Sequence, residues 1–179
     1  MPSICRSIYQ GKIIDVNIET AHLPDGQSVE LEVVRHPGGA AVVALDSADN
    51  VCLLRQYRHA ADGWLWELPA GKLEDGEAPR LTAERELAEE AGLSARVWTS
   101  LGLLMSSPGV FTETIHLFLA RRLTEVRRHP EPHELIEVHW VPLAEALEWA
   151  HSGRIVDGKS LVGLCRAEAL INRSATAPL

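Results

Sequence analysis

Apolar and polar residues follow two kinds of spacing along this chain, and each kind predicts a different element. Alternation with a period of two, or a short apolar run bounded by turn residues, is typical of a strand. Apolar residues that recur every three or four positions are typical of a helix. The predicted strands cover residues 12–22, 28–36, 40–45, 51–57, 96–104, 113–120 and 136–141.

Helical spacing is found in three segments, which cover residues 79–91, 143–151 and 159–171. Pro79 suits the first turn of the first helix, where its missing N–H is not needed. Gly92 suits the left-handed position just past the end of that helix. The segment after Asn172 is small and polar, and we expect it to fray.

Turn residues divide the predicted elements into two parts. The first two strands flank a Pro24-Asp25-Gly26 turn, so they are expected to pair as an antiparallel hairpin. A Pro-Gly-Gly segment then separates this hairpin from the rest of the chain. We therefore predict a small N-terminal β subdomain at residues 1–38 and a main α/β domain at residues 39–179. With 46% hydrophobic residues, the 179-residue chain can bury one ordinary core and a small extension.

Charge and cysteine usage narrow the class of protein. The 17 Lys and Arg residues are outnumbered by 25 Asp and Glu residues, and the resulting net charge of −8 disfavours a nucleic acid as the main partner. Cys5, Cys52 and Cys165 are odd in number and lack metal-site spacing, which favours reduced packing thiols. The chain shows neither a signal-peptide pattern nor an apolar run near the roughly 18 residues of a membrane span. We expect a soluble, cytoplasmic protein.

Residues 71–93 carry the most informative pattern, GKLEDGEAPRLTAERELAEEAGL. In the predicted helix at 79–91, alanine and leucine side chains share one stripe and can pack against a sheet. Three carboxylates gather on another stripe, at spacings i, i+3 and i+4. These carboxylates belong to Glu86, Glu89 and Glu90.

A helix face that carries three carboxylates needs a counterion. Like charges at i, i+4 destabilise a helix by roughly 0.2–0.5 kcal/mol per pair, and a bound cation removes the repulsion. Carboxylate oxygens without thiolate partners favour Mg²⁺ or Mn²⁺, and Mg²⁺ is typically held by a few carboxylates while it engages substrate phosphates. The alternative is a solvated acidic face, but it does not account for Gly71, Glu77, Arg85 and Gly92.

The segment fits G-x5-E-x7-R-E-L-x-E-E-x-G-L at every defined position and therefore resembles the Nudix box. This resemblance implies an α/β/α sandwich with a mixed sheet. It also implies an enzyme that hydrolyses a nucleoside diphosphate linked to another moiety.

The resemblance also assigns roles to residues of the box. By position, Glu86 and Glu90 resemble the principal metal ligands, and Glu89 resembles a further ligand or a water-orienting base. Glu77 and Arg85 resemble an ion pair that ties the loop to the helix. The backbone carbonyl of Ala70 resembles an additional metal ligand.

A second motif narrows the resemblance to a subgroup. Pro108, in MSSPGVFTE, lies 16 residues beyond Gly92, a place that resembles the ADP-ribose pyrophosphatases of the family. Members of this subgroup are typically homodimers whose N-terminal strands cross to the partner and help to build the nucleotide pocket. Taken alone, Pro108-Gly109 is equally well explained as a simple turn.

Four further side chains are candidates for substrate binding. Arg55 and Arg58, in RQYRH, end a strand near the glycine-rich entry to the box and could contact a diphosphate in bidentate fashion. The alternative is that they are ordinary surface arginines. Trp64 and Trp66 are candidate stacking platforms for adenine, although tryptophan is more often a core or interface residue.

The catalytic base is expected in the segment HPEPHELIEV, before the last strand, where members of the family commonly carry an acidic loop. Glu134 occupies a position that is expected to be acidic. Pro132 occupies a neighbouring position that is often acidic, so Glu131 and Glu89 remain rivals. The alternative is that these loop glutamates are simply exposed charges.

These observations predict a Mg²⁺-dependent hydrolase that cleaves ADP-ribose to AMP and ribose 5-phosphate through attack of an activated water on the diphosphate. In this scheme Arg55 and Arg58 stabilise developing charge on the phosphate oxygens. Another nucleoside diphosphate sugar, such as GDP-mannose or ADP-glucose, remains an alternative substrate. A Nudix module that senses ADP-ribose without turnover is the alternative outside enzymes.

Overall fold

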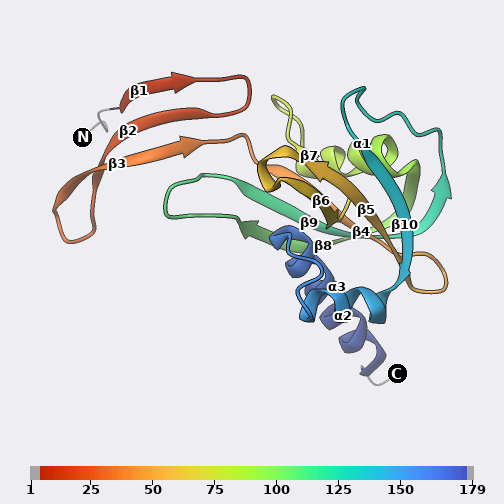
Figure 1. Cartoon of the computed structure of the whole chain (residues 1–179). Coiled ribbons are helices and arrows are strands. Elements are labelled where there is room, and N and C mark those ends of the chain that lie inside the picture. Colours follow the sequence, from red (N-terminus) through yellow and green to blue (C-terminus); the bar gives the residue numbers. More distant parts are fainter. Residues whose placement is uncertain (1–4, 177–179) are drawn as a thin grey trace.

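The computed structural model describes residues 5–176, with backbone alone for 174–176 (Figure 1). These residues form ten strands, three α-helices and a short 3-10 helix at His59–Ala61. The helices are α1 (Pro79–Ala91), α2 (Leu143–His151) and α3 (Gly158–Thr176). The strands are β1 (Cys5–Gln10), β2 (Asp15–His22), β3 (Ser28–Arg35), β4 (Gly39–Ala44), β5 (Asn50–Arg58), β6 (Gly63–Glu67), β7 (Ala70–Lys72), β8 (Leu93–Met105), β9 (Thr114–Glu125) and β10 (Ile136–Pro142).

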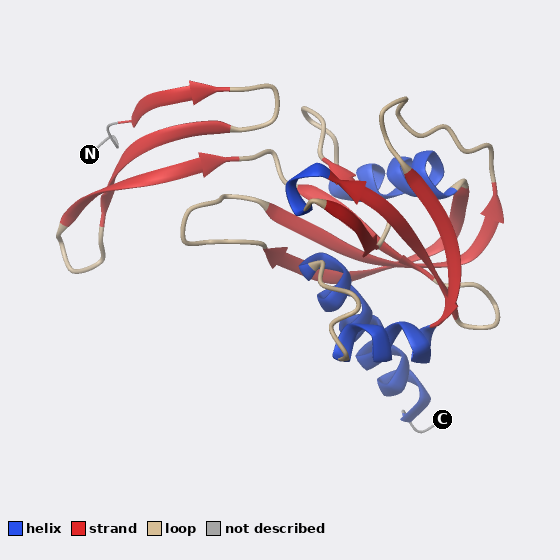
Figure 2. Cartoon of the chain, viewed as in Figure 1, coloured by secondary structure: helices blue, strands red, loops and turns tan. Residues whose placement is uncertain are grey.

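The main body is a sandwich of helices around two sheets. One sheet has the order β7-β4-β9-β8 and is mixed, because β4 runs parallel to β9 while the other pairs are antiparallel. The other sheet, β10-β5-β6, is antiparallel. Helix α1 covers one side of the sheets, and α2 and α3 cover the other side (Figure 2). The predicted α/β/α sandwich with a mixed sheet is confirmed.

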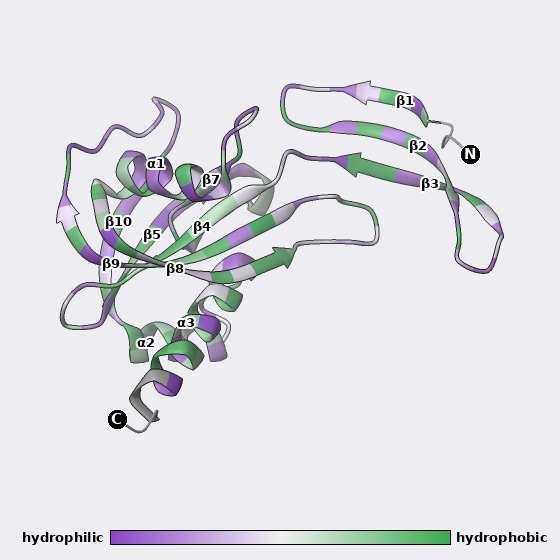
Figure 3. Ribbon diagram, turned by 180° about the vertical axis from the view of Figure 1, so that it is seen from behind, coloured by the Kyte–Doolittle hydropathy of each residue, from purple (hydrophilic) through white to green (hydrophobic). Residues whose placement is uncertain are grey.

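Strand β4 lies at the centre because it is apolar on both faces (Figure 3). Ala41 and Val43 point into a core shared with α2 and α3. Ala40 and Val42 point into a second core, which Ala83 of α1 helps to fill. Successive side chains of a strand point to opposite faces, so a continuous apolar run produces a strand that is covered on both sides.

Helix α1 begins and ends where the sequence predicts. Ala78 provides no side-chain cap, so the start depends on Pro79, whose fixed φ suits the first turn. Gly92 adopts the left-handed conformation with φ of 68°, and its N–H donates to carbonyls of the last turn. A residue with a Cβ would be strained at this φ, which explains the glycine.

The N-terminal residues form a separate sheet that projects away from the main body (Figure 1). β2 and β3 pair as the predicted hairpin, with Asp15 opposite Arg35 and His22 opposite Ser28. β1 adds a third strand, which the sequence did not indicate because its six residues are all exposed and carry no apolar pattern. Val34 attaches the sheet to the β8–β9 loop, since its N–H donates to the Val110 carbonyl at 2.7 Å.

Two other expectations need correction. Helix α3 continues beyond Asn172 to Thr176, so the described part of that tail is helical, and residues 177–179 lie outside the described part. Cys52 is buried as a packing thiol, whereas Cys5 and Cys165 are exposed. Within residues 5–176, no helix is both long enough and apolar enough to cross a bilayer.

A buried ion network fixes the start of α3 to the sheet. Glu67, which is 2% exposed, accepts hydrogen bonds from Arg58 Nε at 2.8 Å and Nη2 at 2.9 Å. Lys159 Nζ donates to the same carboxylate at 2.5 Å and to Asp157 at 3.0 Å. Asp157 in turn accepts the backbone N–H of Ser160 at 3.1 Å and so satisfies the first turn of α3. Burial opposes the charge of Glu67, but Arg58 and Lys159 outweigh it and lower its pKa to about 2.

We expect Glu67→Gln to lower the free energy of unfolding at pH 7 by about 3 kcal/mol, because it leaves the largely buried Lys159 and the half-buried Arg58 without their shared counterion. The pKa of Glu67 changes from 4.5 to about 2 on folding, so its contribution is present above pH 4.5 and is lost as the pH falls toward 2. Denaturant unfolding from pH 2 to 7 tests this. The difference between wild type and variant should shrink at the acid end.

Glu84→Gln is the matched control. Glu84 pairs with Arg80 on the outer face of α1, where an i,i+4 ion pair contributes only about 0.5 kcal/mol. Equal losses in the two variants would contradict the structural role given to Glu67.

Candidate functional site

A cavity of about 630 Å³ opens between α1, the start of α3, the β8–β9 loop and the loop at residues 126–135. Its walls bring together segments that are distant in the sequence. The Nudix-like segment contributes four of the lining residues, Gly71, Arg85, Glu86 and Glu89. The acidic loop contributes Glu131 and Glu134. Other elements contribute Arg58, Ala70 and Lys159.

Glu86 lies directly against β7. A Cβ on Gly71 would stand 1.8 Å from Glu86 Oε1, so any other residue at position 71 would displace this carboxylate. Glu86 is 9% exposed, and burial is the main cause that raises its pKa. The alternative of a solvated acidic face is therefore wrong for Glu86.

Glu90 is buried more deeply, with 2% of its surface exposed. Its Oε2 accepts the backbone N–H of Ala70 at 2.8 Å, which places the carboxylate beside the proposed carbonyl ligand. Burial raises the pKa of Glu90 to about 8, and the neighbouring charges of Glu86 and Glu134 add to the effect. The carboxyl group is therefore held in a place where its ionised form is costly without a nearby cation.

Arg85 connects the carboxylates of the helix to the loop before it. Its Nη2 lies 3.0 Å from Glu77, the ion pair that the resemblance implied. Its Nη1 lies 2.7 Å from Glu86 and 3.4 Å from Glu89. The hydrogen bonds from Arg85 lower the pKa of Glu77 to about 2.

The acidic loop faces this helix. Glu131 and Glu134 line the cavity, and the charge of Glu134 raises the pKa of both Glu86 and Glu90. The two loop residues also hold each other: Glu131 N–H donates to the Glu134 carboxylate at 3.0 Å, and Glu134 N–H donates to the Glu131 carbonyl at 3.0 Å. The structure therefore brings the three candidate bases, Glu89, Glu131 and Glu134, into one cavity.

The donor set is suited to a hard divalent cation. Within residues 5–176, no three His, Cys, Asp or Glu side chains converge tightly enough to hold a metal ion as they stand. The Arg85 guanidinium contacts Glu86 and Glu89 together, so positive charge already lies beside these two carboxylates. Carboxylate and carbonyl oxygens are the ligands that Mg²⁺ and Mn²⁺ prefer.

Of the candidate substrate-binding residues, Arg58 lines the cavity and the other four do not. Arg58 donates two hydrogen bonds to Glu67, so its guanidinium is held in one orientation. Arg55 is exposed, lies 3.7 Å from Glu137 and stacks 5.6 Å from the Trp64 ring centroid. Pro108 is exposed in the β8–β9 loop.

Trp66 is half-buried and packs against the core, and it does not line the cavity. Its ring lies 5.0 Å from that of Trp149 and 4.9 Å from that of His139, measured between centroids. Arg154 stacks on Trp149 at 3.6 Å. These contacts favour the alternative that was open for Trp66, namely a packing residue.

The cavity contains residues that the sequence did not single out, among them His36, Glu113 and Lys159. His36 Nδ1 accepts the N–H of Gly38 at 3.0 Å, and burial lowers the pKa of the imidazole. Only the Pro-Gly-Gly turn after His36 could have drawn attention to it. Lys159 occupies the first turn of an amphipathic helix, a place that gives no local sign of a cavity wall.

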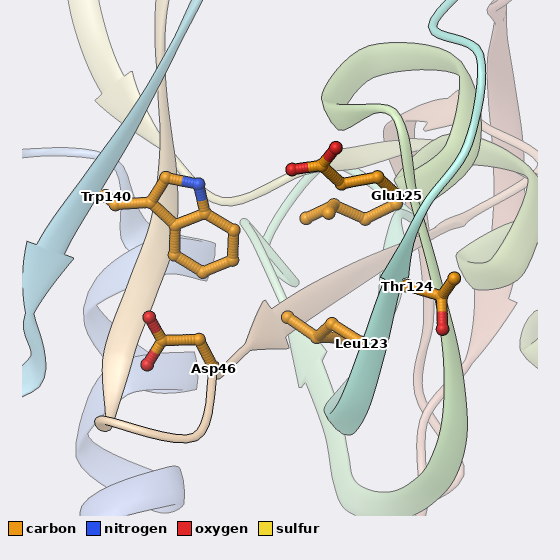
Figure 4. Close-up of a pocket in the computed structure, with 6 residues that line it drawn as sticks. Asp46, Leu123, Thr124, Glu125 and Trp140 are labelled. Carbon is orange, nitrogen blue, oxygen red and sulfur yellow. The ribbon is translucent and has the colours of Figure 1, made fainter.

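A second hollow, of about 300 Å³, lies beside the turn between β4 and β5 (Figure 4). Trp140 and Asp46 lie on one side of it, and Leu123, Thr124 and Glu125 lie on the other. It contains none of the predicted site residues. The carboxylate of Asp46 already accepts backbone N–H groups of its own turn, so this hollow offers little free polar chemistry.

Comparisons with known proteins agree with the geometry. A model of the NUDIX domain matches residues 35–160, and the chain therefore belongs to the Nudix family. The chain is 39% identical over 155 residues to the ADP-ribose pyrophosphatase of Bacillus subtilis (strain 168), an alignment that covers 86% of this chain and 84% of the relative. It is also 39% identical over 167 residues to the ADP-ribose pyrophosphatase of Mycobacterium tuberculosis, covering 92% of this chain and 81% of the relative.

A solved structure described as an ADP compounds hydrolase superposes on the chain with a TM-score of 0.81 and covers 99% of this chain and 98% of the other. At 18% identity, this likeness supports the fold alone. The prediction of a Nudix hydrolase is confirmed at the level of the family.

We expect Glu90→Gln to stabilise the protein in the presence of a chelator by about 1–3 kcal/mol at pH 7. On folding, the wild type must either take up a proton at Glu90 or bury its charge, whereas the amide keeps the acceptor for Ala70 N–H at neither cost. The pKa of Glu90 rises from 4.5 to about 8 on folding, so between these pH values the unfolded chain loses the proton while the folded protein keeps it. The stability of the wild type therefore falls as the pH rises through this range. The advantage of the variant should therefore grow from pH 5 to pH 8. Thermal unfolding at several pH values measures it, and an advantage that is constant with pH would contradict the raised pKa.

Proposed function

We propose that this protein hydrolyses the diphosphate of a nucleoside diphosphate sugar, and that ADP-ribose is its preferred substrate. The products would be AMP and ribose 5-phosphate, since water supplies the oxygen of the new P–O bond as the bridging P–O bond breaks. The observation that carries the proposal is the meeting of Glu86, Glu89 and Glu134 with Arg58 in one cavity of about 630 Å³. The names of the relatives support the choice of ADP-ribose.

Mg²⁺ is the proposed cofactor, with Mn²⁺ as a substitute. When bound, the cation would neutralise the diphosphate and lower the pKa of a bound water. Glu86 and Glu90 would hold it, together with Glu89 and the carbonyl of Ala70. Glu90 is the strongest indication, because its ionised form has few compensating charges nearby and the pKa of its carboxyl is raised to about 8.

The residues around the cation would divide the remaining work. Glu134 is the proposed base that takes a proton from the attacking water, and Glu131 and Glu89 remain its rivals. Arg85 would keep Glu86 and Glu89 in place through the contacts already described. Arg58, fixed by Glu67, would stabilise charge on the phosphate oxygens.

A homodimer is proposed because the N-terminal sheet is incomplete by itself. Its strands expose large apolar side chains, including Ile8 at 54%, Tyr9 at 57% and Leu31 at 42%. A sheet of this kind needs a partner to cover it. We propose that residues 1–38 act as a dimer-forming subdomain, and that Arg55, Trp64 and Pro108 reach substrate in the dimer rather than within one chain.

Two other functions would use the same cavity. Hydrolysis of GDP-mannose or ADP-glucose would use the same cation and base, so the box does not separate these substrates. A sensor that binds ADP-ribose without turnover would not need the full set of box glutamates, which this chain retains. A cytoplasmic location remains a prediction from the three free cysteines.

The substrate is tested by initial rates on ADP-ribose, ADP-glucose, GDP-mannose, NADH and dGTP at matched Mg²⁺. We expect the highest kcat/KM for ADP-ribose, a margin of up to about 10⁴ over the guanine nucleotides and a smaller one over ADP-glucose, which shares the adenosine half. A pocket that hydrogen-bonds one base leaves its polar groups unpaired with another base, which gives margins of this size. A higher value for GDP-mannose or dGTP would overturn the choice of substrate but not the family.

A chelator and the Glu86→Gln variant serve as controls in the same assay. The chelator should abolish release of AMP, and the variant should lower kcat by roughly 10²-fold or more, because it removes a charged ligand from the proposed cation site. Tight binding of ADP-ribose without any release of AMP would instead favour the sensor.

The dimer is tested by Leu31→Asp. The charge should disrupt an apolar interface and give a monomer with reduced activity, as measured by sedimentation and by AMP release. Val97→Asp, an equivalent change at an exposed position of β8, is the matched control and should leave the dimer intact. A wild-type protein that sediments as a monomer would remove the proposal.

A further inference from the structure

The last carbonyl groups of α1 are bound by the loop that carries the candidate bases. A helix leaves its final carbonyls without intrahelical partners, and other groups must satisfy them. Here the N–H of His129 donates to the Glu89 carbonyl at 3.1 Å, and the N–H of Val126 donates to the Gly92 carbonyl at 2.9 Å. Between them, Arg128 Nε donates to the Glu90 carbonyl.

Arg128 also closes the loop on itself. Its Nη2 donates to the carbonyl of Ile136, the first residue of β10, at 2.9 Å. One guanidinium therefore joins three points: the end of α1, the start of the loop and the end of the loop. Residues 129–135, which include Glu131 and Glu134, form a lobe whose two ends are held together by this side chain.

The chemistry of Arg128 suits this position. A cation near the C-terminus of a helix is favoured by the helix dipole, and a planar guanidinium can donate in two directions at once. Among the described residues no carboxylate pairs with Arg128, so its hydrogen bonds to these two backbone carbonyls are its main polar contacts.

Gly92 allows the loop at residues 126–135 to lie close to the end of α1. A Cβ at this position would stand 3.1 Å from the Val126 carbonyl oxygen and 3.2 Å from the Cβ of Arg128. The last glycine of the box therefore ends the helix and also leaves room for the loop to lie against it.

We propose that Arg128 is a positioning residue for the reaction, which anchors both ends of the lobe at 129–135 beside α1 so that the loop glutamates stay next to the proposed cation ligands. Glu86 and Glu90 lie on the helix, and Glu134 belongs to the lobe whose two ends Arg128 holds beside that helix. The inference rests on the proposed function, because it gives Arg128 a purpose only if a loop glutamate acts on a water at the cation. A displacement of about 1 Å in such an arrangement can lower a rate by up to roughly 100-fold.

The test compares Arg128→Gln, Arg128→Lys and Arg127→Gln. Arg127 is the adjacent residue, is exposed and lies outside the cavity, so it is the matched control. We expect Arg128→Gln to lower kcat by roughly tenfold or more with little change in KM, since the substrate contacts remain. Arg128→Lys should recover part of the loss because an ammonium group can reach one of the two carbonyls, and Arg127→Gln should behave as wild type.

Hydrogen exchange provides a readout that does not depend on activity. In Arg128→Gln the amides of residues 129–135 should exchange faster, while those in the middle of α1 keep their protection. If Arg128→Gln keeps the kcat of Arg127→Gln, the inference is wrong. The inference is also wrong if amide protection is lost throughout α1. It is wrong as well if Arg128→Lys, which preserves the charge, both lowers kcat and raises KM.

The Glu86→Gln variant separates this inference from the proposed function. A large loss of kcat in Glu86→Gln combined with wild-type kcat in Arg128→Gln would overturn the role of Arg128 and leave the function in place. Normal kcat in Glu86→Gln would overturn the role of Glu86 as a cation ligand, whereas a wild-type protein that releases no AMP would overturn the function itself, and the role of Arg128 with it.

Discussion

The burial of two like-charged carboxylates on one helix is the constraint on which the rest of the site depends. Glu86 and Glu90 are 9% and 2% exposed, and each has a raised pKa because burial disfavours its charged form. A helix with such a face is unfavourable unless positive charge lies close by. Arg85 supplies part of that charge, and the proposed divalent cation would supply the remainder. The cation that we propose for this site would therefore offset a cost that arises from how α1 packs against β7.

Elements on both sides of α1 are fixed by charged side chains rather than by apolar packing alone. Glu67 binds Arg58 and Lys159, which attaches the start of α3 to the sheet and orients Arg58 along the cavity wall. Arg128 binds the carbonyls of Glu90 and Ile136, which attaches the acidic loop to the end of α1. Buried polar and charged groups of this kind each need their hydrogen-bond partners in place at the same time, so their geometry tolerates little variation. A site assembled from three distant segments can thereby keep one arrangement.

The N-terminal sheet is held in place differently from the elements around α1. Its residues are largely exposed, and it contacts the main body mainly through hydrogen bonds of Val34 with the β8–β9 loop. Its apolar side chains have no core of their own to enter. The stability of the main body therefore comes from the two cores around β4, whereas the sheet is available for contact with a second chain. Ile13, between β1 and β2, also lines the cavity, so a change in this sheet would reach the site.

The sequence by itself determined the parts that depend on local spacing. Pro79 and Gly92 set the ends of α1, the apolar run of β4 set the centre of the sandwich, and the box set the carboxylate face, because each of these follows from neighbours in the chain. The tertiary structure alone decided which distant side chains meet. It brought Lys159 and His36 into the cavity, packed Trp66 against the core and left Arg55 outside the cavity. Such outcomes depend on how strands and helices pack, and no local pattern in the sequence encodes that packing.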